Sequence, residues 1–165
     1  MSDPDATLGL EVRIRPADDD DFPLIEARIR KWSDRQVLLP LAGGALRVLL
    51  PDFRVLSPAF GPPIVLAFGA LRRYSPRLAE IRSLVVADEF QGRGLGRLLV
   101  DELLDEARQA GLERVFVLTR VTGIFEKLSF SLVPRESLPQ KVFVDCSICR
   151  RRQCCDELAL VKEMT

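Results

Sequence analysis

The clearest pattern of hydrophobic positions runs from Gly94 to Ala110. Leucine and alanine recur there at the three- and four-residue spacing of a helix, with charged residues between them. Gly111 follows directly, where a glycine commonly ends a helix. The pattern predicts an amphipathic helix over 94–110 that buries one face against a core.

Shorter hydrophobic runs, bounded by Pro, Gly and Ser, predict the strands and the remaining helices. The predicted strands lie at 12–16, 53–56, 64–71, 79–86, 114–118, 130–133 and 158–162. We predict further helices from about 18 to 32, within 35–51 and at 123–129. The four aspartates at 18–21 are interpreted as the solvated entrance of the first helix.

The order of these elements indicates the fold class. The second, third and fourth strands are joined by turns, whereas the later strands alternate with helices. We therefore expect an α/β (α+β) fold: a mixed, mostly antiparallel sheet of about six to seven strands with helices on both faces.

Composition is that of one ordinary domain. Of the 165 residues, 47% are hydrophobic, and 24 basic residues balance 24 acidic ones, so no nucleic-acid partner is indicated. We expect a single domain over 1–165, with residues 1–10 disordered. The acidic start is unlike a signal peptide, and no apolar run is long enough for a membrane span, so we expect a cytoplasmic protein with no membrane partner.

The segment with the most specific chemistry joins the strand at 80–86 to the long helix. Its sequence is Gln91-Gly92-Arg93-Gly94-Leu95-Gly96. Glycines let the backbone approach a ligand closely, and the amides and dipole of a helix N-terminus attract phosphate. Arg93 and Arg97 add positive charge. The glycine spacing differs from the dinucleotide fingerprint, and the Gly-Lys-Ser/Thr of a P-loop is absent.

The remaining pattern, Gln-x-x-Gly-x-Gly, resembles the pyrophosphate-binding motif of the GNAT superfamily of N-acetyltransferases. Both flanks agree, because a strand precedes the motif and Thr119–Phe130 resembles the next motif of that superfamily. The resemblance implies acetyl-CoA as co-substrate and a splay between the fourth and fifth strands. It assigns no metal ion. The cofactor-binding residues that it implies are Leu84, Val85, Val86, Gln91, Gly92, Arg93, Gly94, Leu95, Gly96, Arg97 and Phe125.

Glu80 is the candidate catalytic base. The chain has no histidine, so a carboxylate is the best available group to accept the proton of the acceptor amine, directly or through one water. The alternative is that Glu80 pairs with Arg82 or another cation. Phe125 stands where the superfamily usually has a tyrosine as general acid, and Tyr74 lies far upstream. We therefore expect the thiolate, whose thiol pKa is near 8.5, to leave without such an acid.

Within the superfamily, the chain resembles short-form bacterial N-acetylglutamate synthases. The residues that carry this resemblance are 79–84, 125–130 and 133–142. It implies acetyl transfer to the α-amine of an amino acid, L-glutamate, with Arg82, Ser83 and Lys141 binding the acceptor. Arginine and lysine suit a dicarboxylic acceptor because they pair with carboxylates. A homodimer is a further expectation from the resemblance.

Two residues depart from the family pattern. Leu41 replaces an arginine that meets a carboxylate, unless Arg35 or Arg47 takes its place, and Ser129 replaces a glycine. Two alternatives therefore stay open. One is acetylation of another amine, in a small molecule or at a protein N-terminus. The other is a catalytically silent sensor that binds acyl-CoA.

All four cysteines lie in one cluster near the end of the chain, at Cys146, Cys149, Cys154 and Cys155. Three of them match a spacing that is common in short forms of the family. A metal site would need a fourth ligand, and a disulfide or free thiols are the alternatives.

Overall fold

The computed structural model describes residues 11–34, 43–139, 142–143 and 156–165. In chain order, the elements are β1 (Val12–Pro16), α1 (Phe22–Asp34), α2 (Gly43–Leu49), β2 (Phe53–Pro58), β3 (Ala67–Arg73), β4 (Leu78–Val86), α3 (Leu95–Gln109), β5 (Arg114–Thr119), α4 (Gly123–Lys127), β6 (Ser131–Val133) and β7 (Leu158–Glu163), with short 3-10 helices at Leu50–Asp52, Asp88–Phe90 and Arg135–Ser137. The expected disorder of residues 1–10 lies outside the described residues.

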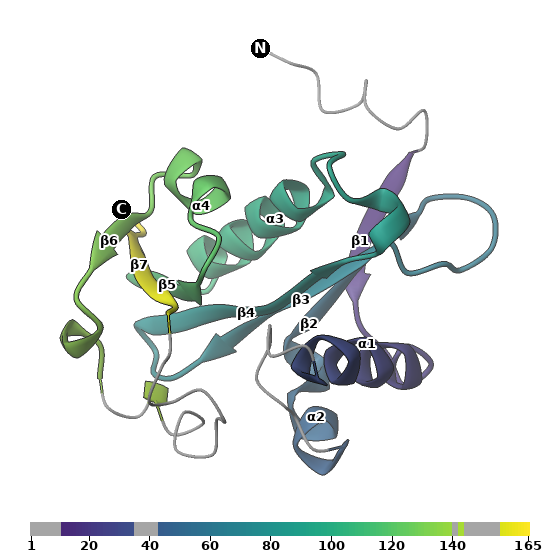
Figure 1. Ribbon diagram of the computed structural model, residues 1–165, viewed down its shortest axis with the longest axis horizontal. Helices are drawn as coiled ribbons and strands as arrows, with labels where there is room; N and C mark the ends of the chain where they lie inside the picture. Colours follow the sequence, from purple (N-terminus) through teal and green to yellow (C-terminus); the bar gives the residue numbers. More distant parts are fainter. Residues whose placement is uncertain (1–10, 35–42, 140–141, 144–155) are drawn as a thin grey trace.

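The strands form one sheet in the order β1-β2-β3-β4-β5-β7-β6, in which the β4–β5 pair is parallel and the other pairs are antiparallel. Helices α3 and α4 lie on one side of the sheet, and α1 and α2 lie on the other (Figure 1). Each side has its own hydrophobic cluster. The predicted fold class is therefore confirmed, including a mostly antiparallel sheet with helices on both faces.

The sheet opens between β4 and β5. The two strands pair only where Leu78–Glu80 lies beside Arg114–Phe116. Beyond Glu80, β4 continues to Val86 and pairs with β3 alone among the described strands. The predicted splay between the fourth and fifth strands is thus present, and it begins at Glu80.

A bulge in β4 follows the point of splay. The β3–β4 register shifts between Phe68 and Ala70, and Ser83 has a φ of 54°, which a non-glycine residue rarely adopts. Because one extra residue is inserted, the alternation of faces changes. Leu84 packs with the α3 cluster and Val85 with the α1–α2 cluster.

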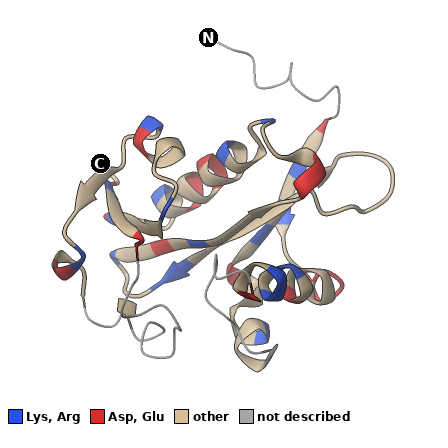
Figure 2. Cartoon of the chain, in the orientation of Figure 1, with Lys and Arg blue, Asp and Glu red and all other residues tan. Residues whose placement is uncertain are grey.

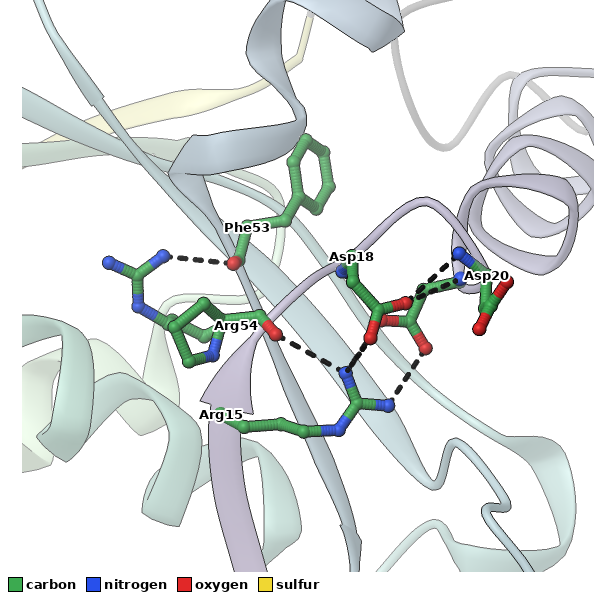
Figure 3. A network of polar contacts seen from close by, with 7 residues as sticks. Arg15, Asp18, Asp20, Phe53 and Arg54 are labelled. Atoms are coloured by element: carbon green, nitrogen blue, oxygen red, sulfur yellow. Dashed lines mark hydrogen bonds and ion pairs between the residues drawn. The ribbon is translucent and has the colours of Figure 1, made fainter.

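The first helix begins later than predicted, at Phe22, and Asp21 is not solvated. Its side chain is 6% exposed, and Arg15 donates hydrogen bonds of 2.7 and 2.9 Å to its carboxylate. Figure 3 shows Arg15 within this network of polar contacts, beside Asp18. The hydrogen bonds from Arg15 hold the pKa of Asp21 below its ordinary value. The expectation of a solvated entrance is wrong for Asp21, which ties β1 to the start of α1.

The start of strand β3 also differs from the sequence pattern, whereas helix α3 agrees with it. Strand β3 begins at Ala67 rather than at residue 64, since Ile64 is exposed and precedes the first ladder pair. Helix α3 matches its prediction to one residue at each end, and Gly111 has the predicted left-handed conformation, with a φ of 72°. No helix in the described part of the chain is both long and apolar enough to cross a bilayer.

Candidate active site

The turn before α3 forms an open cradle of backbone. Gly92 and Gly94 have φ values of 76° and 79°, and a Cβ atom added to either would meet nothing within 4 Å. Gly94 is the N-cap of α3, has no side chain to cap the first amides, and is followed by no acidic residue in the first turn. These features leave the positive end of a 15-residue helix open to an anion.

Side chains of this turn contact neighbouring groups and so stabilise its conformation. Gln91 Nε2 donates to the carbonyl of Val86 at 3.3 Å and to Asp88 at 3.4 Å. Arg93 lies 5.3 Å above the ring of Phe90. Basic residues colour this turn and the start of α3 in Figure 2. The predicted phosphate-binding residues are thus brought together, with basic side chains at the rim.

Leu95, Gly96 and Arg97 begin the helix itself. The side chain of Leu95 is buried at 1% exposure, so only its backbone is available to a ligand. A Cβ on Gly96 would lie 3.7 Å from Val86 and 3.8 Å from Ile124, which is ordinary contact. Arg97 lies 3.9 Å from Asp101 on the exposed side of the helix.

Strand β4 brings the other predicted donor-binding residues to the opening of the sheet. The side chains of Leu84 and Val86 pack toward α3, and that of Val85 packs on the opposite side. Their backbone lies after Glu80, where β4 pairs with β3 and no longer with β5. Strand amides there are placed to bind an extended ligand as a neighbouring strand would.

Glu80 lies at the last pair of β4 with β5 and is 7% exposed. Its carboxylate accepts a hydrogen bond of 2.7 Å from the hydroxyl of Tyr74. Burial, and then the negative charge of Glu80, raise the pKa of Tyr74 well above its ordinary value. The sequence reasoning set Tyr74 aside as distant, but the structure brings it to the candidate base.

The register of the β3–β4 hairpin explains this contact. The turn at Ser75–Arg77 joins β3 to β4, and the register places Arg72 opposite Glu80. Tyr74 is then the diagonal neighbour of Glu80, and such neighbours are within reach of an aromatic side chain.

The predicted acceptor residues are only partly described. Arg82 is opposite Ala70 in the β3–β4 register, two residues after Glu80 on the same face of the sheet. Ser83 is the bulge residue and is buried. Lys141 lies outside the described residues, as do Leu41 and Arg35. Arg47 is described, and its guanidinium lies 4.0 Å above the ring of Phe22.

Phe125 on α4 is 4% exposed, and its ring meets that of Phe130 edge-on at 5.4 Å. Ser129, between them, has a φ of 68°. This left-handed conformation explains why a glycine is usual at the position.

The cysteine cluster lies outside the described residues. Among those that are described, no group of three or more potential metal ligands comes together.

Comparison with known proteins agrees with this geometry. Residues 52–130 match the model of the acetyltransferase (GNAT) family. An uncharacterized N-acetyltransferase from Chlorobaculum tepidum is 42% identical over 95 residues, which are 58% of this chain and 61% of the relative, so less than two thirds of that relative is spanned. An amino-acid acetyltransferase from Mycobacterium tuberculosis is 37% identical over 130 residues, 79% of this chain and 74% of its own length.

A solved structure shows the same arrangement of elements. The N-acetylglutamate synthase of Neisseria gonorrhoeae, crystallised with coenzyme A and N-acetyl-glutamate, superposes with a TM-score of 0.79 and 26% identity. The superposition covers 93% of this chain and 35% of that protein. The similarity therefore extends over nearly the whole chain and about a third of the solved relative.

Proposed function

The chain belongs to the GNAT family of acetyltransferases, and we propose that it transfers the acetyl group of acetyl-CoA to the α-amine of L-glutamate. The observation that carries the proposal is the position of Glu80, a buried carboxylate at the point where β4 and β5 separate. The names of the relatives support an amino acid as acceptor.

The donor site uses the open turn and the edge of β4 that β5 leaves free beyond Glu80. The backbone of 91–96 offers amides to the pyrophosphate of acetyl-CoA, and no atom occupies the space beside Gly92 and Gly94. The acyl arm enters the gap beside β4, where amides near Leu84 and Val86 hydrogen-bond the thioester carbonyl. These amides stabilise the negative charge that develops on that oxygen during the reaction.

The reaction removes two protons from the nitrogen of the acceptor. The α-ammonium of glutamate loses the first proton to Glu80, directly or through a water, and the resulting amine nitrogen forms a bond to the thioester carbon. The carbon–sulfur bond then breaks, CoA leaves as a thiolate, and the nitrogen gives its second proton to that thiolate or to water, which leaves a neutral amide. A thiolate is a tolerable leaving group, because the pKa of a thiol is near 8.5. Phe125 packs against Phe130. Its phenyl ring has no acidic proton, so it cannot protonate the leaving thiolate.

Acceptor specificity rests on basic residues around this centre. Arg82 shares a face of the sheet with Glu80 and is proposed to pair with one carboxylate of glutamate. Ser83 is proposed to hydrogen-bond the ligand, and Lys141 to contact a carboxylate.

The test is a CoA-release assay with L-glutamate, L-glutamine, L-aspartate and L-arginine as acceptors. We expect the highest kcat/KM with glutamate. Glu80→Gln is expected to reduce kcat roughly 100-fold or more, whereas Glu102→Gln, at an exposed position on α3, leaves it unchanged. A different preferred amine would overturn glutamate as acceptor. Binding of acetyl-CoA without CoA release on any acceptor would favour the silent sensor.

A further inference from the structure

We infer that Tyr74 is a positioning residue for the catalytic base, because its hydroxyl fixes the carboxylate of Glu80 where the acceptor amine delivers its proton. The inference rests on the proposed function, in which Glu80 is that base. It concerns a residue that the family motifs do not include and that enters the site through the β3–β4 hairpin.

The sheet dictates that these two side chains meet. Arg72 and Glu80 are opposite each other in the antiparallel β3–β4 ladder, and Tyr74 is two residues beyond Arg72 on the same face. The phenol spans the diagonal and donates a 2.7 Å hydrogen bond to Glu80 Oε2. A short bond from a neutral donor to a carboxylate is among the stronger hydrogen bonds in proteins.

The ring of Tyr74 is itself held in place. The centroid of the Tyr74 ring lies 5.7 Å from that of the Phe116 ring on β5. The guanidinium of Arg72 lies 5.0 Å from the centroid of the Tyr74 ring. Leu78 and Phe116 belong to the buried cluster against which Tyr74 packs. Because the ring is held by these contacts, the direction of the hydroxyl is set by packing and does not depend on bound substrate.

The electrostatics of the contact favour the ionised base. The charged groups that act on Tyr74 are Glu80 itself, Arg72 from β3 and Arg82 from β4, and β5 contributes the apolar Phe116. The pKa of Tyr74 is raised, so the phenol remains a donor throughout the neutral pH range. A hydrogen bond donated to a carboxylate stabilises its ionised form, which is the form that accepts a proton.

Tyr74→Phe tests the inference, because it removes the hydroxyl and keeps the ring against Phe116. We expect kcat with glutamate to fall roughly 10- to 100-fold, which is the range for losing a hydrogen bond to a charged group. The KM values for both substrates should stay within about 2-fold of wild type, and the acid limb of the kcat–pH profile should move to higher pH. In a Glu80→Gln background, the same substitution should have no further effect on kcat, since its action passes through Glu80.

A second measurement needs no turnover. Tyr74 is the single tyrosine of the chain, so the absorbance of tyrosinate reports its ionisation alone. We expect it to ionise at lower pH in Glu80→Gln than in the wild-type protein, and identical titrations would overturn the contact.

The two hypotheses fail differently. A Tyr74→Phe protein with wild-type kcat and pH profile would overturn the positioning role and leave the proposed function standing. A wild-type protein that releases no CoA with glutamate would overturn the proposed function, and with it any catalytic role of the contact.

Discussion

Replacing either of two glycines at the start of α3 by alanine should change the stability of the fold, in opposite directions for Gly94 and Gly96. Gly94 has a φ of 79° with open space around a would-be Cβ, whereas Gly96 lies inside the helix with ordinary contacts at 3.7 and 3.8 Å. The structure therefore predicts that Gly94→Ala destabilises the fold and that Gly96→Ala does not.

The magnitudes follow from backbone conformation alone. A left-handed alanine costs about 1–2 kcal/mol, offset by about 0.4–1 kcal/mol from the less flexible unfolded chain. The net loss for Gly94→Ala is then about 1 kcal/mol. In a helix interior, alanine is favoured over glycine by up to about 1 kcal/mol, and the added methyl of Gly96→Ala touches Val86 and Ile124 without overlap. The two variants should differ by about 2 kcal/mol.

Urea denaturation of both variants measures this difference, and thermal melting should separate them by roughly 4–8 °C for a chain of this length. Gly94→Ala should also raise the KM for acetyl-CoA. The left-handed conformation is strained for alanine, and relief of that strain would reorient the amides that we propose bind pyrophosphate. If Gly94→Ala were as stable as wild type, or Gly96→Ala less stable than it, the conformation assigned to this turn would be refuted.

Further predictions concern the fold around the site. Asp21→Asn should lower the free energy of unfolding by about 2 kcal/mol, since it leaves Arg15 without its buried carboxylate. The folded-state pKa of Asp21 is below its ordinary 3.8, so this stabilisation is complete above that value and is lost as pH falls through the lowered pKa. Urea titrations of wild type and Asp21→Asn across this acid range test the prediction that only wild type loses this stabilisation. Equal pH dependence of the two proteins would contradict it. Ser129→Gly should stabilise the protein by about 1 kcal/mol, because glycine adopts the left-handed conformation of this residue without strain. The control Ser131→Gly, in strand β6, should destabilise it. A lower free energy of unfolding in both variants, measured by urea denaturation, would refute the prediction.

Features of the site that depend on local sequence could be predicted. Glycine spacing predicted the open turn before α3, because the backbone conformation at Gly92 and Gly94 is one that glycine adopts readily. The helix after it followed from its hydrophobic period, and the Gly111 terminus from the same conformational preference. In both cases the residues that determine the structure are adjacent in the sequence.

Features that depend on register could not be predicted in the same way. Tyr74 reaches Glu80 only because the β3–β4 turn places Arg72 opposite Glu80, and a register shift of one residue would turn it to the other face. The burial of Asp21 depends on Arg15 in the neighbouring strand, and a run of four aspartates contains no information about that partner. The bulge at Ser83 inserts one extra residue into β4 opposite β3, and the hydrophobic pattern of the strand does not mark it.

Acetyl transfer from acetyl-CoA to glutamate can be followed directly by the mass of the product. The protein would be incubated with acetyl-CoA labelled in its acetyl group and with L-glutamate, and free CoA and labelled N-acetyl-glutamate would be quantified together. We expect equal amounts of the two products, with the label on the α-amine and with formation strongly reduced in Glu80→Gln. Release of CoA without labelled N-acetyl-glutamate, or no release above the rate without enzyme, would contradict it.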